Sequence, residues 1–540
     1  MVITIKNMTN KKKNDDPIHS RMRKYVNRHM SNLFKRTVYI LLFATIQIAL
    51  LVVSFTYLGN LTPYFWTFCM LISLIQAMHI LNKNNNPAYK IAWLIPILVA
   101  PIFGGLLYLM FGSKRVNKRL TTITNDIQEK YAEFSPCVVP SIEKKIAEEA
   151  PRNVALQSSY ISKASGCLPY GSTQTKYFPS GEELFPVMYE ALKQAKQYIF
   201  IEYFIIEEGL FWESILDILT EKVKEGVEVR VMYDDFGSML TLPLNYDKML
   251  RERGIKSHVF NPFNTVLHPR PNNRDHRKIT VIDGKTAFVG GINLADEYIN
   301  TFEKYGYWKD TALQMTGDAA FGCTIQFLCV WDADTHEKTD FTKYTPRPSD
   351  KEEPAQSTLS IVQPYTDIPM DSEQVGESVY FQMVTRAEKY IYITTPYLII
   401  DYEMQTALQI AAKSGVDVRI ITPHIPDKKM VFFLTRSYYK PLMDAGVKIY
   451  EFTPGFIHAK SMVSDDRFAV VGSINLDYRS LYLHLENAVW MYNTEVITDI
   501  RNDFLATQEK SQLVTEELLG RLTLPKRMWL SILRTFSPLL

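Results

Sequence analysis

Three long apolar segments near the beginning of the chain dominate its pattern of hydrophobic and polar positions. Val38 to Leu58, Tyr64 to Leu81 and Ile91 to Phe111 span about 21, 18 and 21 residues, and none contains Asp, Glu, Lys or Arg. A helix of roughly 20 apolar residues can cross the hydrocarbon core of a bilayer. The pattern therefore predicts a multi-pass membrane protein, with two or three apolar helices in a membrane segment at 37–112.

The third apolar segment differs from the other two because it contains residues that interrupt helices. Pro96, Pro101, Gly104 and Gly105 all lie inside it. Within a membrane, such residues occur where a helix kinks or re-enters. We therefore expect this segment to be either a kinked span or a re-entrant segment.

Basic residues flank the apolar segments on both sides. Residues 1–36 carry ten Lys or Arg against two Asp, and four more basic residues follow between Lys114 and Arg119. The tail is either a solvated arm or a cytoplasmic flank, since cytoplasmic flanks of membrane spans are enriched in Lys and Arg. Three complete spans would place the two basic flanks on opposite sides, so the pattern leaves the sidedness open.

Beyond about residue 165 the pattern changes to alternating helices and strands, and it occurs twice. Ala195 to Ile206 resembles Ala387 to Ile400, and Gly226 to Met232 resembles Gly415 to Ile421. Both pairs have the helix-then-strand order of an α/β sheet. A repeat of about 185 residues is too long for a solenoid unit. We therefore predict an α/β fold in which transmembrane helices precede two duplicated lobes that meet face to face.

These patterns divide the chain into segments. The expected segments are a basic tail (1–36), the membrane segment (37–112), a linker region (113–165), lobe 1 (166–345), a second linker (346–357), lobe 2 (358–521) and a basic amphipathic C-terminal segment (522–540). The C-terminal segment mixes basic and large apolar side chains. That mixture is typical of a helix on a membrane surface, or of a helix packed on the neighbouring lobe.

Each predicted lobe contains one copy of the same polar motif. The first copy is His276-x-Lys278-x4-Asp283 with Gly290, Gly291 and Asn293, and the second is His458-x-Lys460-x4-Asp465 with Gly472, Ser473 and Asn475. The offsets from His to Gly and Asn are identical, which chance does not explain. Alternate side chains of a strand share a face, so each His and its Lys point the same way. A hairpin then returns each Asn toward them.

Residues of these types suit attack on a phosphodiester. One neutral imidazole can act as nucleophile and a second can protonate the leaving alcohol. Two lysines and two asparagines can hold the nonbridging oxygens. We predict one shared site at the interface between the lobes, without assigning the nucleophile. Its predicted catalytic residues are His276, Lys278, Asp283, His458, Lys460 and Asp465, and its predicted phosphate-binding residues are Asn293, Asn475 and Ser473.

Composition limits the other classes. A formal net charge of +2 argues against a partner such as nucleic acid that binds through overall positive charge. The five cysteines form no C-x-x-C pattern, which argues against a disulfide framework or a zinc site. No cluster of Cys, His or carboxylate residues at ligand spacing is evident near the motifs. We therefore predict no metal and no cofactor.

Several segments resemble a known family. The paired motifs are similar to the HKD motifs of the phospholipase D superfamily. The segments Asn86 to Trp93, Pro101 to Gly112, Gly306 to Asp310 and Asn475 to Ser480 resemble bacterial cardiolipin synthases, as does Glu486. The resemblance covers about residues 38–540. It implies that one phosphatidylglycerol transfers its phosphatidyl group to a histidine, and that a second phosphatidylglycerol accepts it to form cardiolipin in a bacterial cell membrane.

The resemblance also implies a carboxylate behind each catalytic histidine. It assigns Glu486 to His458 and Asp310 to His276, with a structural ion pair as the alternative for both. Two other functions stay open on the residues alone. The same site could serve a phospholipase D or nuclease that uses water, or the chain could be a membrane scaffold with a relic site. Intact motifs argue against a relic, and the apolar segments favour lipid over nucleic acid. The oligomeric state stays open.

Overall fold

The structure is a computed structural model that describes residues 59–83, 86–112, 121–138, 142–262, 273–345, 359–369, 373–520 and 523–539, together with residue 371 and isolated positions between 42 and 57. The basic tail at 1–36 and the linker at 346–357 lie outside the described residues, as does much of the first apolar segment, Val38 to Leu58.

Lobe 1 is built on a seven-stranded sheet with the order β1-β8-β6-β5-β2-β3-β4. Its strands are β1 (Thr173–Phe178), β2 (Tyr198–Tyr203), β3 (Glu228–Asp234), β4 (Lys256–Phe260), β5 (Lys278–Ile282), β6 (Thr286–Gly290) and β8 (Ala312–Gly317). Its helices are α9 (Gly181–Lys193), α10 (Leu210–Lys224), α11 (Tyr246–Glu252) and α12 (Asp318–Thr335), with short 3-10 turns at η4 (Asp296–Ile299) and η5 (Phe341–Tyr344).

Lobe 2 is built on an eight-stranded sheet with the order β19-β13-β12-β10-β15-β16-β18-β9. Its strands are β9 (Ile361–Asp367), β10 (Tyr390–Thr394), β12 (Asp417–Pro423), β13 (Lys448–Phe452), β15 (Ser461–Ser464), β16 (Phe468–Gly472), β18 (Glu486–Tyr492) and β19 (Ser511–Leu513). Its helices are α13 (Val375–Arg386), α14 (Tyr402–Lys413), α15 (Lys429–Ser437), α16 (Tyr439–Met443), α17 (Tyr478–Tyr482), α18 (Val496–Glu509), α19 (Glu516–Leu519) and α20 (Leu524–Phe536), followed by η7 (Ser537–Leu539).

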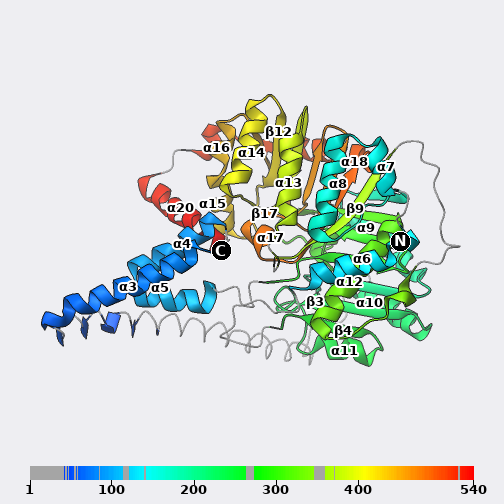
Figure 1. The fold of residues 1–540 in the computed structure, drawn as a ribbon. Helices are drawn as coiled ribbons and strands as arrows, with labels where there is room; N and C mark the ends of the chain where they lie inside the picture. The colour runs from blue at the N-terminus through cyan, green and yellow to red at the C-terminus, as the bar shows by residue number, and fades with distance from the viewer. Residues whose placement is uncertain are drawn as a thin grey trace.

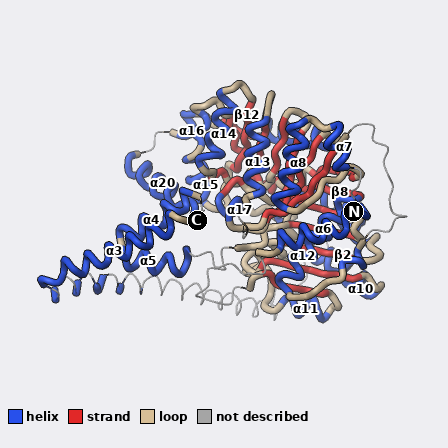
Figure 2. Tube along the Cα trace, viewed as in Figure 1, coloured by secondary structure: helices blue, strands red, loops and turns tan. Residues whose placement is uncertain are grey.

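The two sheets repeat one arrangement. In lobe 1, β2 pairs in parallel with β3 and antiparallel with β5, and in lobe 2, β10 pairs in the same way with β12 and β15. The strands of both sheets lie between helices (Figure 2). The predicted α/β fold with two duplicated lobes is therefore confirmed, because the repeated sequences form equivalent central strands.

Helix α12 joins the two lobes into one body. It is buried on almost every side, and its residues belong to a continuous core that reaches from Phe200 and Phe327 in lobe 1 to Trp490 in lobe 2. Two short parallel sheets, β7 (Tyr307–Lys309) with β14 (Gly455–Ile457) and β11 (Leu398–Ile399) with β17 (Leu476–Asp477), lie outside the main sheets. The first of these pairs a strand of each lobe.

The stretch at 113–165 is not a linker, as far as the structure describes it. It forms α6 (Ile123–Val138), α7 (Ile142–Glu149) and α8 (Arg152–Ser165). Ile123, Ile127, Val154 and Ile161 are fully buried in the common core. The prediction was wrong because the many charged residues on the exposed faces of these helices hide their apolar stripes.

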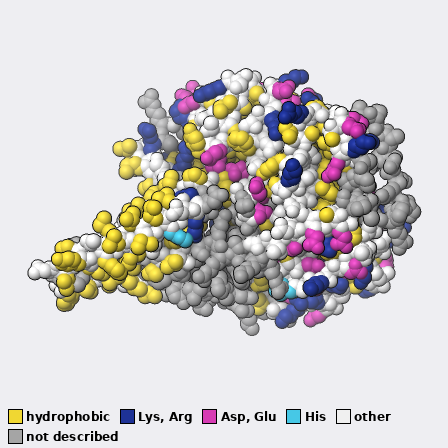
Figure 3. Space-filling model, viewed as in Figure 1, with side chains coloured by type: hydrophobic (Ala, Val, Ile, Leu, Met, Phe, Trp, Pro, Cys, Tyr) yellow, Lys and Arg dark blue, Asp and Glu magenta, His cyan; other side chains and the backbone are white. Residues whose placement is uncertain are grey.

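The apolar helices project from the lobes as an arm (Figure 1). They are α3 (Thr62–Leu81), α4 (Pro87–Val99) and α5 (Pro101–Leu107), followed by one π-helical turn at Tyr108–Gly112. Yellow, apolar side chains cover the arm in Figure 3. Among the described residues, Gly59–Leu81 is the one helix long and apolar enough to cross a membrane. The structure thus supports one candidate span where the pattern predicted two or three.

The third apolar segment is a hairpin of two short helices. Ala100 leaves the helical conformation with φ −135° and ψ 81°, and Pro101 begins α5. A Cβ atom on Gly104 would lie 2.3 Å from the carbonyl oxygen of Pro96, so α5 folds back closely against α4. The glycine is needed for this approach. Of the two expectations, the single kinked span is therefore wrong.

Candidate functional site

The two motifs lie at equivalent places in the two lobes. His276 lies two residues before β5, and Lys278 is the first residue of that strand. His458 follows β14, and Lys460 directly precedes β15. His276 and His458 are 6% and 8% exposed, and both lysines are buried. The motifs therefore form a nearly closed polar site between the lobes, as the duplicated pattern predicted.

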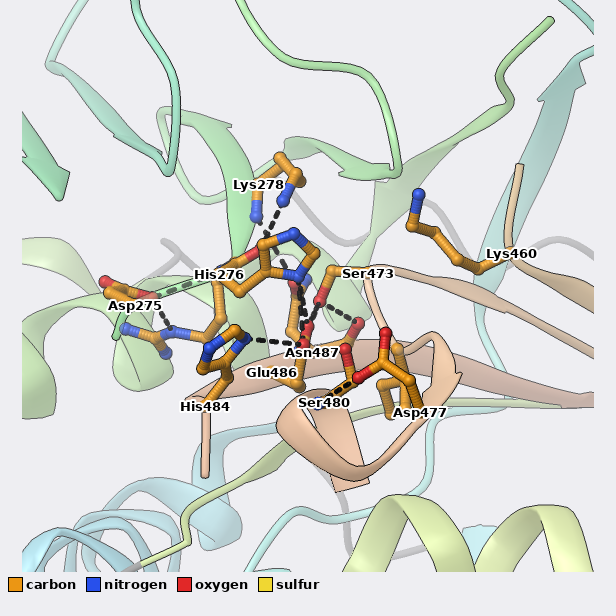
Figure 4. Close-up of polar contacts among 12 residues, drawn as sticks. Asp275, His276, Lys278, Lys460, Ser473, Asp477, Ser480, His484, Glu486 and Asn487 are labelled. Atoms are coloured by element: carbon orange, nitrogen blue, oxygen red, sulfur yellow. Dashed lines mark hydrogen bonds and ion pairs between the residues drawn. The ribbon is translucent and has the colours of Figure 1, made fainter. Parts of the chain in front are cut away.

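Each motif histidine contacts a carboxylate of the other lobe. The Nδ1 atom of His276 lies 2.9 and 3.0 Å from the two carboxylate oxygens of Glu486. The Nδ1 atom of His458 lies 2.6 Å from Oδ2 of Asp310. Figure 4 shows His276 reaching Glu486 across the interface. The expected assignment of Glu486 to His458 and of Asp310 to His276 is therefore wrong, because the pairs are exchanged.

Backbone pairing between the lobes explains the exchange. The backbone N–H of His276 donates to the carbonyl of Leu485 at 2.9 Å, and the backbone N–H of His458 donates to the carbonyl of Lys309 at 2.7 Å. Glu486 and Asp310 are the next residues along the chain. Each histidine is thus tied to the residue before its carboxylate, which brings the two side chains together.

Burial holds both imidazoles neutral at neutral pH. The pKa of His458 is lowered to about 4, first by burial and then by Lys460, although Asp310 acts in the opposite direction. The pKa of His276 is lowered well below its usual value by burial, with a further contribution from Lys278. A neutral imidazole whose Nδ1–H donates to a carboxylate keeps a lone pair on Nε2, which a nucleophile requires.

The pKa values of the two motif lysines lie near neutral pH. Burial lowers the pKa of Lys278 to about 7 and that of Lys460 to about 8. Each Nζ donates to the backbone carbonyl of the histidine in its own motif. Burial also raises the pKa of Glu486 to about 8. An anionic phosphate in this site would therefore increase the positive charge on the lysines that surround it.

The predicted phosphate ligands have different surroundings. The side chain of Asn293 is hydrogen-bonded within lobe 1. It accepts from the backbone N–H of Ile205 at 3.1 Å and donates to the hydroxyl of Tyr298 at 2.6 Å. Ser473 donates its hydroxyl hydrogen to Glu486 and so positions that carboxylate. Asn475 is buried, and its Oδ1 has no hydrogen-bond partner among the described residues. Asn475 stays a predicted phosphate ligand, through its amide NH2 group, whereas Asn293 and Ser473 already have partners within the protein.

The two motif aspartates lie away from the histidines. Asp283 accepts hydrogen bonds from the backbone N–H groups of residues 196–198 at 2.7 to 2.9 Å, and Asp465 accepts equivalent bonds from residues 388–390 at 2.8 to 3.0 Å. Both adopt positive φ angles at the end of their strand. Their observed partners are therefore structural, and their catalytic role stays a prediction. They lock the start of β2 and β10 to the hairpin that carries each motif.

The chain matches known families over both lobes and the arm. Residues 188–304 and 380–507 match "Cardiolipin synthase, PLD-like domain", and residues 70–113 match "Phospholipase_D-nuclease N-terminal". A cardiolipin synthase of Geobacillus sp. (strain WCH70) is 35% identical over 460 residues, which are 85% of this chain and 90% of that protein. The chain belongs to the cardiolipin synthase family of the phospholipase D superfamily.

Other relatives agree with membership of this family. A cardiolipin synthase of Geobacillus kaustophilus (strain HTA426) is 34% identical over 512 residues, covering 92% of this chain and 99% of that one. An uncharacterized protein of Streptococcus mutans is 44% identical over 474 residues, covering 86% and 99%. The predicted enzyme class, a phosphatidyl transferase of the phospholipase D type, is confirmed. A relic site or hydrolysis as the main function is not favoured.

A solved structure shares the fold. The phosphatidylserine synthase of Haemophilus influenzae Rd KW20 is 16% identical, has a TM-score of 0.52, and covers 68% of this chain and 95% of its own. At this level of identity the likeness concerns the fold. It supports the paired α/β lobes that family membership already implies.

Sequence analysis missed His484 in this cardiolipin synthase site. Its ring lies 5.5 Å from that of His276, and its Nδ1 lies 3.8 Å from Glu486. Neither ring nitrogen has a hydrogen-bond partner among the described residues. His484 precedes Glu486 by two residues, as Trp308 precedes Asp310, and the Trp308 ring lies 5.7 Å from that of His458. In both lobes, the residue two positions before the carboxylate lies beside a motif histidine. This shared spacing is the sequence signal that could have identified His484.

His484 also changes the expectation about metals. His276, His484 and Glu486 place ligand atoms within 4.8 Å of one another, in an arrangement that could hold a metal ion. The sequence argument assumed that no such cluster lies near the motifs, and this assumption was wrong. Burial lowers the pKa of His484, and the nearby cations Arg479, Lys278 and Arg274 lower it further. Their charge disfavours a divalent cation at the same place.

The exchanged pairs can be tested by replacing one carboxylate at a time. We expect Asp310→Asn to lower the pKa of His458 further, because the anion that favours its charged form is lost, and to leave His276 nearly unchanged. Deuterium exchange at the histidine C2 position, read by mass spectrometry, reports each imidazole separately. Glu486→Gln should alter the exchange of His276 and spare His458. A response of the histidine in the same lobe would contradict the assignment.

The motif aspartates should contribute to stability rather than to chemistry. Asp283→Ala and Asp465→Ala each leave three backbone N–H groups without their acceptor, so we expect the free energy of unfolding to fall by about 2 to 4 kcal/mol. Thermal unfolding measures this loss. Asp217→Ala, on α10, is the matched control and should change little. Activity per folded molecule should stay near that of the unchanged protein, and a hundredfold loss in a fully folded variant would restore the catalytic assignment.

Proposed function

We propose that this protein is a cardiolipin synthase that transfers a phosphatidyl group from one phosphatidylglycerol to another through a phosphohistidine. The observation that supports this most directly is the pair of buried histidines, each oriented by a carboxylate of the opposite lobe, in a chain of this family. Two separately oriented imidazoles provide a nucleophile and an acid within one closed site.

The reaction has two balanced steps. In the first, the Nε2 lone pair of one histidine forms a P–N bond and the P–O bond to the glycerol head group breaks. The other histidine, which takes up a proton on Nε2 when the anionic phosphate enters the site, gives that proton to the departing glycerol oxygen. In the second, a hydroxyl of the second phosphatidylglycerol gives its proton to that other histidine and attacks phosphorus, and the P–N bond breaks. Two phosphatidylglycerols become one cardiolipin and one glycerol.

Lys278 and Lys460 would stabilise the transition state in both steps. Each now donates to a backbone carbonyl, so each would turn to the nonbridging oxygens when substrate arrives. Asn475 would donate to the same oxygens. Preorganised donors in a site with little water stabilise developing charge far better than donors in solution. We propose that these residues replace a metal ion, and that the enzyme needs no cofactor.

The arm would hold the site at the membrane. Gly59–Leu81 is long enough for one span, and we propose that the first apolar segment and the hairpin of α4 and α5 complete a multi-pass anchor in the bacterial cell membrane. The substrates are then supplied from the bilayer, where a lipid acceptor is far more concentrated near the site than in solution. Phosphatidylglycerol and cardiolipin are the proposed partners, and nucleic acid is not.

Purified protein given phosphatidylglycerol alone tests the proposal. We expect cardiolipin and glycerol in equal amounts, unaffected by chelator at constant lipid composition. His276→Ala and His458→Ala should each lower the rate by a factor on the order of 10² or more, because each removes one of the two required imidazoles. Mass spectrometry of a trapped phosphohistidine identifies the nucleophile. Phosphatidic acid as the main product, or near-normal activity in either folded variant, would refute the proposal.

The pH profile gives an independent test. For a short-chain soluble phosphodiester, which stays monoanionic, kcat/KM should fall as pH drops through about 4 if His458 is the nucleophile, because protonation removes its Nε2 lone pair. It should fall again as pH rises through about 7 to 8, where Lys278 and Lys460 lose theirs. Bound phosphate raises the pKa of both lysines, so the alkaline limb of kcat should lie at higher pH than that of kcat/KM. If the alkaline limbs of kcat and kcat/KM lie at the same pH, the lysines do not bind the phosphate.

A further inference from the structure

We propose that helices α15 and α20 form a second membrane-contact surface, which lies in the head-group region of an anionic bilayer beside the catalytic site. This inference rests on the proposed function and adds the surface through which lipid would approach. We call it the α15–α20 face. Its apolar members are Met430, Phe433, Leu524, Met528, Trp529 and Ile532.

The α15–α20 face exposes large apolar side chains next to one another. Their exposed fractions range from 41% for Phe433 to 69% for Leu524. The buried sides of the same helices are also apolar, with Leu434 in α15 and Leu530 and Leu533 in α20. A helix that packs on a lobe needs only its inner side to be apolar. The outer apolar side is therefore unexplained by folding and marks an interaction surface.

The charges on this face identify the partner. Lys428, Lys429, Lys526 and Arg527 accompany the apolar residues, and neither α15 nor α20 contains an acidic residue. The Nζ atom of Lys526 lies 5.1 Å from the ring centre of Phe433, so basic and apolar groups alternate within one patch. This combination suits anionic phospholipid. A second copy of the chain would bring the same positive charges together, which disfavours self-association through this face.

The position of α20 makes the face continuous with the arm. Helix α20 packs against α15 and α4, and η7 packs against α4. Leu539 contacts the small apolar core of the arm formed by Ile80, Trp93, Ile97 and Tyr108. In Figure 1, α20 lies where the arm meets lobe 2, and Figure 3 shows apolar and basic side chains gathered there. Packing contacts therefore connect the α15–α20 face to the helix that carries the candidate span.

The α15–α20 face is also connected to the catalytic site. In α15, the hydroxyl of Thr435 accepts a hydrogen bond from the backbone N–H of Leu398 in β11. Strand β11 pairs with β17, which begins directly after the candidate phosphate ligand Asn475. A lipid held at this face would thus lie on the side of lobe 2 that supplies one wall of the site. Its head group could enter without the acyl chains leaving the bilayer.

Photocrosslinking in full-length protein tests the surface. p-Benzoylphenylalanine placed at Phe433 or Trp529, in proteoliposomes of phosphatidylglycerol with a zwitterionic lipid, should form lipid adducts detected by mass spectrometry. Leu156 in α8, 53% exposed and far along the chain from the arm, is the matched control. We expect adduct yields at least about fivefold above this control. Equal yields at all three positions, or crosslinks to a second copy or another protein, would overturn the proposal.

Kinetics separates this surface from the chemistry. The double variant Phe433→Ser with Trp529→Ser removes two large membrane-facing side chains, so we expect cardiolipin formation in proteoliposomes to fall roughly tenfold. Turnover of a short-chain soluble phosphodiester should stay within about twofold, because the site itself is unchanged. Lys526→Glu with Arg527→Glu should give the same selective loss, roughly fivefold per charge at low salt. Unchanged cardiolipin formation in both variants would refute the surface.

The two proposals fail in different ways. If the unchanged protein forms lipid adducts at Phe433 and Trp529 but makes no cardiolipin, the membrane surface stands and the proposed function fails. If it makes cardiolipin and both variants retain it fully, the function stands and the surface fails.

Discussion

The exchange of carboxylates between the lobes is the contact on which the catalytic site depends. Glu486 holds His276 and Asp310 holds His458, and in each case a backbone hydrogen bond one residue earlier sets the distance. Because both pairs cross the same interface, a small separation of the lobes would disturb both histidines together. The buried helix α12 and the pairing of β7 with β14 resist such a separation. The way in which the lobes dock therefore sets the geometry of the catalytic site.

The site also holds many ionisable groups away from water. Burying a charge is costly unless it is paired, and here the cost appears as shifted pKa values. Lys278 and Lys460 become weaker bases, Glu486 becomes a weaker acid, and both histidines stay neutral. A phosphate diester would bring a negative charge next to these two lysines and raise their pKa. The site therefore suits an anionic ligand better than a neutral one.

The two halves are not equivalent around their histidines. The rings of Trp308, Tyr298 and Phe456 lie within 6 Å of His458, whereas Phe204 and His484 flank His276, and Ser473 donates to Glu486. Gly291 stands where Ser473 stands in the second motif, and a Cβ there would meet Asp310 at 2.2 Å. Duplication thus preserved the His and Lys of each motif while the residues around them diverged. This difference is the structural basis on which two histidines can perform different tasks.

The sequence by itself determined the repeated strands, the paired motifs, the family and the apolar character of the N-terminal region. These features depend on residues close together in the chain, such as the alternation that puts His276 and Lys278 on one face of a strand. The tertiary structure decided which carboxylate meets which histidine, that Asp283 and Asp465 support backbone groups, and that His484 joins the site. These contacts join residues 75 to 210 positions apart. They follow from how two similar lobes dock, a geometry that local pattern and spacing do not specify.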